Sequence, residues 1–232
     1  MAIELFELHG LNGRRYSLYS WRARMALAHK GLTFESRPVK ITDKAAIAFS
    51  GQTRVPILRD GATVVSDSWK IAEHLERVYP ERPSLFGGAG GHALARFVNA
   101  WADRPLVAAV VPCLMLDNVA ALEADDAAYL RAVIEKASGK TLEALAEDRA
   151  ASLKGFAKLL DPVRATLRAQ DFLSGAGPGY ADYIVFSVLQ WARVASATPV
   201  LPADDALWSW FERVLDAHDG VGRAEPARRL RV

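Results

Sequence analysis

A serine hydroxyl at position 17 directly precedes a stretch, residues 18–30, whose composition is that of a helix. A helix begins with amide groups that have no partner inside the helix, and it carries a partial positive charge at that end. A sulfur atom placed there is stabilised as a thiolate, and a hydroxyl that donates to the sulfur adds to this preference. No cysteine of the chain lies near this position in the sequence. The pattern therefore predicts that Ser17 activates a thiol that belongs to a ligand.

The choice of residue within this loop stays open at the level of local sequence. Tyr16, Tyr19 and Ser20 offer rival hydroxyl groups beside Ser17. Serine is also among the residues preferred as a plain helix cap, so Ser17 alone does not establish a thiol site. Two motifs further along the chain carry the interpretation.

The first of these motifs is a proline in an apolar run, Arg54-Val55-Pro56-Ile57-Leu58. The run predicts a strand, and proline inside a strand cannot donate to the hydrogen-bond ladder, which favours an edge or a bulge. A cis peptide bond between Val55 and Pro56 would turn the N–H and C=O of Val55 toward an extended peptide ligand. An ordinary edge-strand proline is the equal alternative.

The second motif is Asp67-Ser68, at the start of a predicted helix that runs to Tyr79. A serine at a helix start, with free amides behind it, is suited to bind a carboxylate. An aspartate beside it can pair with an ammonium group, so the two residues together fit the amino-acid end of a ligand. A simple helix cap is the alternative for this motif alone. The order and spacing of the three motifs favour one thiol-containing ligand.

The elements that carry these motifs alternate along the first 80 residues. Apolar and alternating runs predict strands, and the first predicted helix ends at Gly31. Arg59-Asp60-Gly61 is a strong hairpin signal. The predicted order is strand 3–8, helix 18–30, strand 33–39, a polar helix-like stretch at 43–49, strand 55–58, strand 63–65 and helix 67–79. This order predicts an α/β unit, a mixed sheet with helices on both faces.

A stretch rich in proline and glycine, residues 81–91, interrupts this alternation. Such a composition is typical of a linker between domains. Beyond it only helical patterns occur, at residues 92–116, 126–145, 149–169, 180–195 and 206–217. We therefore predict an N-terminal domain at residues 1–80 and an all-helical domain at residues 92–232.

Composition indicates a folded protein and excludes several classes of function. Hydrophobic residues make up 51% of the 232 residues, which is enough for substantial cores. The net charge of +2 does not indicate a nucleic-acid surface, and we expect the basic tail, residues 228–231, to be solvated. No apolar run approaches the ~18 residues of a membrane span, and no signal peptide is evident. A single cysteine suits a reducing compartment, so we expect a cytoplasmic protein.

The first 80 residues resemble the thioredoxin-like domain of the cytosolic glutathione transferases, and the linker with residues 92–220 resembles the second domain of that family. The stretch from Ser17 to Gly31 is similar to the serine-type branch, and Asp67 to Glu76 is similar to bacterial β-etherase-like and related fungal members. The resemblance implies a thioredoxin-like N-terminal domain, an all-α helical-bundle C-terminal domain, glutathione as co-substrate and a homodimer. No metal is expected, because the five histidines show no metal-ligand spacing.

The resemblance also implies roles for individual residues of the N-terminal domain. Ser17 occupies the position of the hydroxyl that activates the glutathione thiol. Val55 matches the residue whose backbone pairs with the cysteinyl part of glutathione, and Pro56 matches the cis-proline. Asp67 and Ser68 match the pair that holds the γ-glutamyl end.

In the second domain the resemblance implies one structural residue and a tentative pocket. Asp182 matches an aspartate that caps a buried helix, although Gly179 stands where the family usually has Ser or Thr. The second substrate is expected between the domains. The candidate pocket residues are Tyr16, Tyr19, Trp101 and Met115.

Three functions remain open on this basis. The leading hypothesis is a glutathione transferase that directs the thiolate at an electrophilic, aromatic or apolar substrate, by conjugation or by cleavage of an ether or thioether. A glutathione-dependent cis–trans isomerase of the maleylacetoacetate type is the second, but Leu18 and Tyr19 stand where that branch has Ser-Cys. The third is a non-catalytic, ligand-binding protein of the same fold. The set of Ser17, Pro56 and Asp67-Ser68 favours an enzyme, because a pure binding module needs no thiol-activating hydroxyl.

Overall fold

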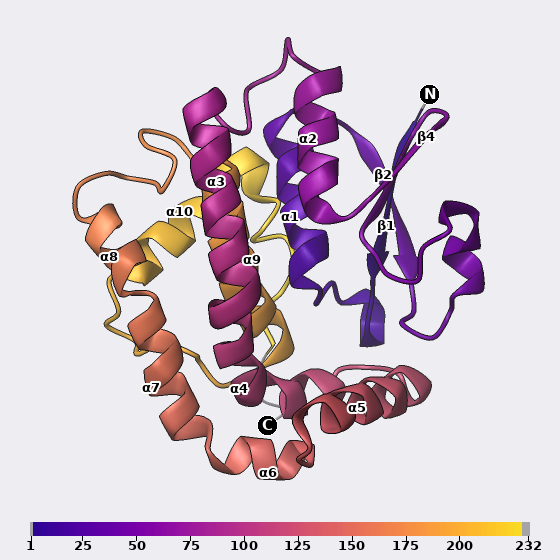
Figure 1. The fold of residues 1–232 in the computed structure, drawn as a ribbon, viewed down its shortest axis with the longest axis vertical. Coiled ribbons are helices and arrows are strands. Elements are labelled where there is room, and N and C mark those ends of the chain that lie inside the picture. Colours follow the sequence, from indigo (N-terminus) through magenta and orange to yellow (C-terminus); the bar gives the residue numbers. More distant parts are fainter. Residues whose placement is uncertain (1, 229–232) are drawn as a thin grey trace.

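A four-stranded mixed sheet forms the centre of the N-terminal part in the computed structural model, which describes residues 2–228. The strands are β1 (Ile3–Leu8), β2 (Phe34–Val39), β3 (Ile57–Asp60) and β4 (Thr63–Ser66), in the order β2-β1-β3-β4. β1 pairs with β2 in parallel and with β3 antiparallel, and β3 pairs antiparallel with β4 (Figure 1). β1 is apolar and buried along most of its length, as a central strand must be.

Helices cover the two faces of this sheet unequally. α1 (Leu18–His29) and α2 (Ser68–Val78) pack against each other on the face that meets the helical part. The opposite face carries only η2, the short 3-10 helix Ala45–Ser50, whose Ile47 packs on a small apolar cluster with Phe6 and Ile57. A second 3-10 turn, η1 (Leu11–Gly13), lies in the loop between β1 and α1. This arrangement and the helical remainder of the chain confirm the predicted fold class.

The helical part begins earlier and is more broken than the sequence predicts. It contains α3 (Ala89–Trp101), a π-helical turn η3 (Ala102–Leu106), α4 (Val107–Val119), α5 (Ala124–Ser138), α6 (Leu142–Glu147), α7 (Arg149–Leu159), α8 (Asp161–Leu167), α9 (Tyr180–Ala195) and α10 (Leu207–Gly220). α3 starts inside the predicted linker. The helix predicted at 126–145 is interrupted because Gly139 adopts a left-handed conformation with φ of +69°. The helix predicted at 149–169 divides at Leu160, where Pro162 favours the start of α8.

α9 is the central helix of the C-terminal part, and nearly all of its side chains are buried. It packs against α1 of the N-terminal part and lies behind α3 in Figure 1. Asp182, which is fully buried in the first turn of α9, accepts hydrogen bonds from the amides of Leu173, Ser174 and Gly179 at 2.7, 3.0 and 3.1 Å. The indole N–H of Trp210 donates a fourth at 2.9 Å. One carboxylate therefore satisfies the start of α9, the preceding loop and α10 together.

A chain of three side chains joins α1, α9 and α10. The Tyr183 hydroxyl lies 2.7 Å from Nδ1 of His29 and 2.6 Å from Nε2 of His218. Nε2 of His29 faces the carbonyl of Ser84 at 3.0 Å, so it carries the proton, and Nδ1 accepts from the tyrosine. Burial and the positive charge that His218 can carry lower the pKa of His29 to about 4. Burial also lowers the pKa of His218 below its usual value. Both rings are therefore largely neutral at pH 7, which suits a buried contact between the two parts.

Two sequence-based expectations concern the chain's surface and its end. Among residues 2–228 no helix is long and apolar enough to cross a membrane. The expectation of a solvated basic tail is wrong for Arg228, whose amide donates to the carbonyl of Arg193 at 2.9 Å and whose guanidinium donates to that of Ala195 at 2.6 Å. The rest of the tail, residues 229–232, lies outside the described residues.

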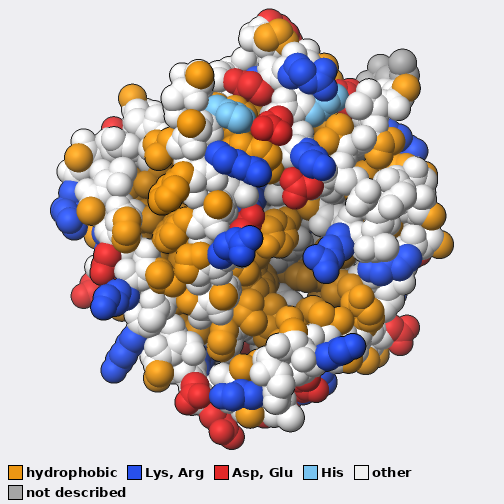
Figure 2. Space-filling model, viewed as in Figure 1, with side chains coloured by type: hydrophobic (Ala, Val, Ile, Leu, Met, Phe, Trp, Pro, Cys, Tyr) orange, Lys and Arg blue, Asp and Glu red, His pale blue; other side chains and the backbone are white. Residues whose placement is uncertain are grey.

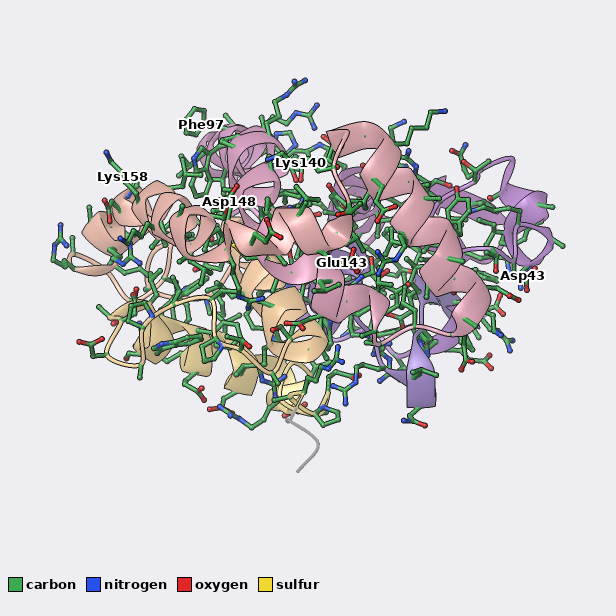
Figure 3. All side chains as sticks on the ribbon, turned by 90° about the horizontal axis from the view of Figure 1, so that it is seen from below. Asp43, Phe97, Lys140, Glu143, Asp148 and Lys158 are labelled. Atoms are coloured by element: carbon green, nitrogen blue, oxygen red, sulfur yellow. The ribbon has the colours of Figure 1, made fainter. Side chains whose placement is uncertain are left out.

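Replacing the buried cap of α9 is expected to be costly for stability. In Asp182→Ala, three backbone amides and one indole lose a charged acceptor, so we expect the free energy of unfolding to fall by about 3–5 kcal/mol. Urea denaturation followed by circular dichroism measures this change. Asp148→Ala is the matched control, since Asp148 lies exposed at the start of α7 without a side-chain cap bond (Figure 3). Equal losses in the two variants would contradict the assigned role of Asp182.

Candidate active site

The three motifs of the N-terminal part meet at one edge of the sheet. The strand register pairs Phe6 of β1 with Ile57 of β3, and Ile57 with Ser66 of β4. The loop after β1, the loop before β3 and the turn after β4 therefore leave the sheet on the same side. A hydrogen bond of 3.2 Å from the amide of Asp67 to the carbonyl of Pro56 ties two of these connections together.

Ser17 is the N-cap residue of α1, directly before Leu18. Its backbone is extended, with φ of −80° and ψ of 118°, and its Oγ accepts a hydrogen bond from the amide of Ser20 at a long 3.4 Å. The first turn of α1 itself contains no acidic side chain, so none of its own residues competes with a ligand anion for the positive end of the helix. Ser17 is also only half-buried. A ligand sulfur can therefore reach the hydroxyl and the free amides from solvent.

The rival hydroxyls lie in different surroundings. Those of Tyr16 and Ser20 are buried, and neither finds a hydrogen-bond partner among the residues that the structure describes. Burial raises the pKa of the Tyr16 phenol. Tyr19 is 37% exposed and lies with its ring 5.1 Å from the Arg22 guanidinium. Tyr19 is thus the only one of the three on the surface.

The peptide bond between Val55 and Pro56 is cis. The structure corrects the expectation that Pro56 lies inside a strand, because β3 begins at Ile57. At this position the missing N–H of proline breaks no ladder hydrogen bond. Val55 is half-buried, and its side chain packs against the small cluster that contains Phe6 and Ile57. The short segment before β3 is thus held by apolar packing.

Asp67 caps α2 and has an unusual backbone conformation. Its Oδ1 accepts hydrogen bonds from the amides of Trp69 and Lys70, at 3.0 and 3.1 Å. Its φ of +85° is rare for a residue with a side chain and tends to persist at binding sites, where the surroundings determine it. The side chain is exposed, and hydrogen bonds from the described residues engage only one of its two oxygens. A negative charge is therefore available beside the start of α2.

Ser68 occupies the first turn of α2 and is 2% exposed. Its carbonyl accepts a hydrogen bond of 2.7 Å from the buried hydroxyl of Tyr180, at the start of α9. No hydrogen bond from the described residues engages its Oγ. The helical part therefore positions the backbone of the Asp67-Ser68 turn, and sequence reasoning missed Tyr180 in this role.

A buried polar cluster, also missed from the sequence, fixes α1 against the helical part. The fully buried guanidinium of Arg22 donates to Ser187 Oγ at 3.2 Å, Asn99 Oδ1 at 3.0 Å and Asp103 Oδ1 at 2.7 Å. Asp103 lies in the π-helical turn η3, a kind of helix irregularity that often occurs at functional sites. An arginine on a largely apolar helix and a proline within a helical pattern, Pro105, are the only sequence signals for this cluster.

The four candidate pocket residues do not come together. Tyr16 and Met115 are buried in the main apolar core. Trp101 lines a hollow of about 330 Å³ formed by α3, α8 and α9, to which the N-terminal part contributes no residue. Tyr19 alone of the four is exposed near the Asp67 and Asp103 carboxylates, whose charges, after burial, raise the pKa of its phenol.

An apolar stripe on α4 is the better-placed surface for an apolar substrate. Ala108 is exposed and Val111 and Pro112 are half-buried, at helical spacings of three and four residues. Val110 and Leu114, on the opposite side of α4, are fully buried. Figure 2 shows a hollow with an apolar floor beside the lower part of the long α3–α4 helix, between it and the sheet domain.

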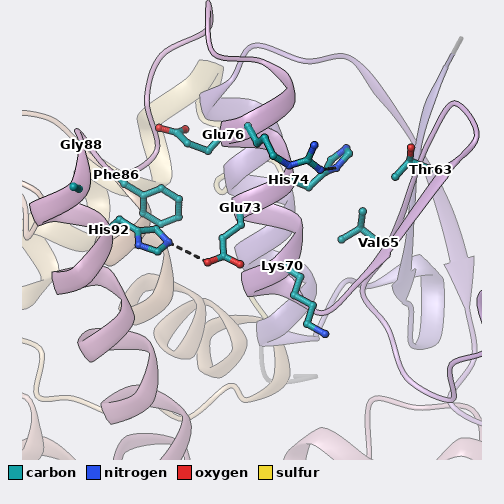
Figure 4. A pocket seen from close by; sticks show the side chains of 11 residues that line it. Thr63, Val65, Lys70, Glu73, His74, Glu76, Phe86, Gly88 and His92 are labelled. Carbon is teal, nitrogen blue, oxygen red and sulfur yellow. Dashed lines mark hydrogen bonds and ion pairs between the residues drawn. The ribbon is translucent and has the colours of Figure 1, made fainter.

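A separate pocket of about 660 Å³ lies on the far side of α2, between β4 and the start of α3 (Figure 4). Most of the residues that line it have polar or charged side chains, and a 3.0 Å hydrogen bond between Glu73 and His92 crosses it. None of the residues predicted from the sequence lines this pocket. Within residues 2–228 no group of three or more His, Cys, Asp or Glu side chains is arranged to hold a metal.

Comparison with known proteins identifies relatives along most of the chain. Residues 16–78 match the family "Glutathione S-transferase, N-terminal domain", and residues 93–220 match "Glutathione S-transferase, C-terminal domain". A rice protein (Oryza sativa subsp. indica), "Probable glutathione S-transferase GSTU1", is 24% identical over 176 residues, which cover 72% of this chain and 65% of the rice protein. A zeta-class glutathione S-transferase of Euphorbia esula is 39% identical over 71 residues, 28% of this chain and 32% of that protein.

The same fold occurs in solved structures. A glutathione S-transferase of Ceriporiopsis subvermispora, crystallised in complex with glutathione, has a TM-score of 0.80 at 20% identity, with 94% of this chain and 97% of that chain covered. The match to the rice relative spans slightly less than two thirds of that protein's length. The C-terminal family match alone covers more than half of the present chain. The chain therefore belongs to the glutathione S-transferase family.

Proposed function

We propose that the protein is a glutathione transferase, which ionises the thiol of glutathione and directs it at an electrophilic, apolar second substrate. The observation that carries this proposal is the convergence of two incompletely satisfied helix starts, at Ser17 and at Asp67-Ser68, on one edge of the sheet. The start of α1 offers the amides of Leu18 and Tyr19, and the start of α2 offers the amide of Ser68, since no hydrogen bond to a described residue engages them. The cis Val55–Pro56 segment reaches the same edge and is joined to Asp67.

In this proposal the two ends of glutathione use different physical interactions. The γ-glutamyl carboxylate binds the amide and hydroxyl of Ser68 at the start of α2, and the ammonium group of the same residue pairs with the exposed carboxylate of Asp67. The backbone of Val55 pairs with the cysteinyl part. The sulfur then lies at the start of α1, where Ser17 donates to it and the helix end favours its negative charge.

The chemical step follows from that placement. The thiol proton leaves to solvent, and a sulfur lone pair forms a carbon–sulfur bond with the second substrate. A leaving group departs with its bonding electrons, or the substrate takes a proton if the reaction is an addition. The protein supplies thiol activation and proximity, which together account for most of the rate enhancement that such a reaction needs.

The apolar stripe of α4 supports an aromatic or apolar second substrate. Ala108, Val111 and Pro112 present no charge, so they favour a desolvated ring over a charged acceptor. We propose the serine type of mechanism and a relationship to the β-etherase-like and related fungal members, because Ser17 is the accessible serine at the start of α1. The reaction can be cleavage of an aryl ether or conjugation to an aromatic electrophile. An assay with both types of substrate distinguishes the two reactions.

We also propose that the protein is a homodimer. α3 leaves Leu94 and Phe97 exposed to 52% and 70%, beside the apolar hollow that contains Trp101. Phe97 projects from the surface in Figure 3. Contiguous apolar side chains this exposed are typical of a surface that a partner covers. A second copy of the chain is the partner that the family resemblance implies.

Glutathione affinity is expected to depend on the start of α2. Asp67→Asn keeps a good helix cap but removes the charge for the ammonium group, and Ser68→Ala removes the hydroxyl for the carboxylate. We expect each change to weaken binding by about 1–3 kcal/mol, measured by isothermal titration calorimetry. Asp148→Asn, at the exposed start of α7, serves as control. An unchanged dissociation constant in the double variant would remove the γ-glutamyl end from this position.

The pKa of enzyme-bound glutathione is expected to depend on Ser17. Thiolate absorbance against pH should show a rise in that pKa of about one unit in Ser17→Ala, equivalent to ~1.4 kcal/mol of lost thiolate stabilisation. Ser20→Ala and Tyr19→Phe, which remove the neighbouring hydroxyls, should leave it unchanged. A rise in Tyr19→Phe but not in Ser17→Ala would transfer the role to Tyr19. No ionisation of bound glutathione in the wild type would favour the non-catalytic alternative.

The proposed association is tested by mass in solution. Light scattering at micromolar concentration is expected to return twice the chain mass of 25.3 kDa, and Phe97→Asp is expected to shift it toward a single chain. Tyr129→Asp places the same charge on another exposed aromatic position, on α5, and should leave the mass unchanged. A wild-type mass of 25.3 kDa would contradict the homodimer.

A further inference from the structure

The loop that carries Ser17 is held by the far end of the chain. Residues 221–228, which we call the strap, follow α10 and run along the end of α9 to this loop. The amide of Arg228 donates to the carbonyl of Arg193 at 2.9 Å, and Gln190 Nε2 donates to the carbonyl of Gly222 at 2.8 Å. The Arg193 guanidinium donates to the carbonyl of Glu225 at 2.8 Å. The strap is therefore fixed to a rigid, buried helix.

The strap contacts the loop through two consecutive arginines. Arg14 donates to the carbonyls of Pro226 at 2.9 Å and Val194 at 3.2 Å. Arg15 Nη1 donates to the Glu225 carboxylate at 3.0 Å. Glu225 is only 4% exposed. A carboxylate this buried needs a charged or hydrogen-bonding partner, and Arg15 is the cation that supplies it.

Arg15 transmits this contact to Ser17 through its own backbone. Its carbonyl accepts a hydrogen bond of 2.8 Å from the indole of Trp21, in the first turn of α1. Its guanidinium also lies 3.6 Å from the buried Glu7 of β1, so the side chain is held between the sheet and the strap. Ser17 follows two residues later. The direction in which the chain enters α1, and with it the position of the Ser17 hydroxyl, therefore depends on Arg15.

We propose that Glu225 is a positioning residue for thiol activation: the strap holds Arg15, and Arg15 holds Ser17 where its hydroxyl meets the glutathione sulfur. This inference rests on the proposed function of Ser17. The carbonyl of Ser17 accepts a 3.0 Å hydrogen bond from the amide of Trp21, but its hydroxyl makes only the long bond to Ser20, which restrains the side chain little. Small displacements at a reacting centre are costly for rate, and the strap supplies the missing restraint from more than 200 positions along the chain.

The variants Glu225→Gln and Glu225→Ala test the proposal in the full-length protein. Glu225→Gln removes the charge but keeps the size and shape of the side chain. It therefore tests the loss of the ion pair even if Glu225→Ala fails to fold. Glu212→Ala is the matched control, because Glu212 forms an ion pair of 2.6 Å with Arg223 on the same strap but on an exposed side. Two readouts are used: amide hydrogen exchange of residues 12–17, and the pKa of enzyme-bound glutathione with kcat and KM for a generic aromatic electrophile.

We expect faster exchange of residues 12–17, a raised pKa of bound glutathione and a kcat lowered about tenfold in the Glu225 variants, with the KM for glutathione nearly unchanged. The Glu212→Ala control should resemble the wild type. In a Ser17→Ala background the effect of Glu225→Gln on the thiol pKa should disappear, because two residues that act through one contact are not additive.

The possible results distinguish a failure of the role proposed for Glu225 from a failure of the role proposed for Ser17. If Ser17→Ala raises the thiol pKa and the Glu225 variants do not, the positioning role is wrong and the proposed function stands. If the Glu225 variants shift the pKa equally with and without Ser17, Glu225 acts by another route and the proposal is again wrong. If Ser17→Ala has no effect on the thiol pKa, the proposed function of Ser17 fails first, and the role of Glu225 fails with it.

Discussion

The amide groups at a helix start must find partners, and this constraint decides where the molecule can bind an anion. At α9 the demand is met internally. The amide of Tyr180 donates to the carbonyl of Leu85 at 2.8 Å, and the buried carboxylate of Asp182 accepts from the amide of Gly179 at 3.1 Å. At α1 and α2 it is met only in part: the side-chain oxygen of Ser17 accepts one long bond, and only one of the two carboxylate oxygens of Asp67 accepts from the amides of α2. The start of α9, whose hydrogen bonds are made within the protein, lies in the buried core. The starts of α1 and α2, which lie on one edge of the sheet, have amides that a ligand can bind.

The helical part covers the sheet domain, and its side chains also fix the positions of the starts of α1 and α2. Tyr180 holds the carbonyl of Ser68, and the Arg22 cluster fixes the middle of α1 against α9 and η3. The strap restrains the loop before Ser17 through Arg15. The ligand-binding groups thus come from the N-terminal part, and their rigidity comes from contacts with the C-terminal part. Such external support is what a preorganised site requires.

Local patterns predicted all four strands, with β3 displaced by two residues, because the apolar run of β1 and the hairpin signal at Arg59-Asp60-Gly61 need no distant contact. They also predicted that Ser17 and Asp67 would lie at helix starts. The local patterns gave wrong or missing predictions where contacts between distant segments determine the structure. α3 begins within a glycine-rich stretch, where the ring of Phe86 packs against His92 of α3 and Tyr180 of α9. Gly139 ends α5 although the helical pattern continues. Arg15 and Glu225 carry no local signal, since their pairing joins the two ends of the chain.

The proposed thiol activation requires that the glutathione sulfur lies at the start of α1 beside Ser17. A crystal structure of the protein with bound glutathione tests it most directly. We expect the sulfur within hydrogen-bond distance of Ser17 Oγ, with the γ-glutamyl carboxylate on the amide and hydroxyl of Ser68 and the ammonium group on Asp67. A sulfur placed beside Tyr19, with Ser17 Oγ still bonded only to the amide of Ser20, would contradict it.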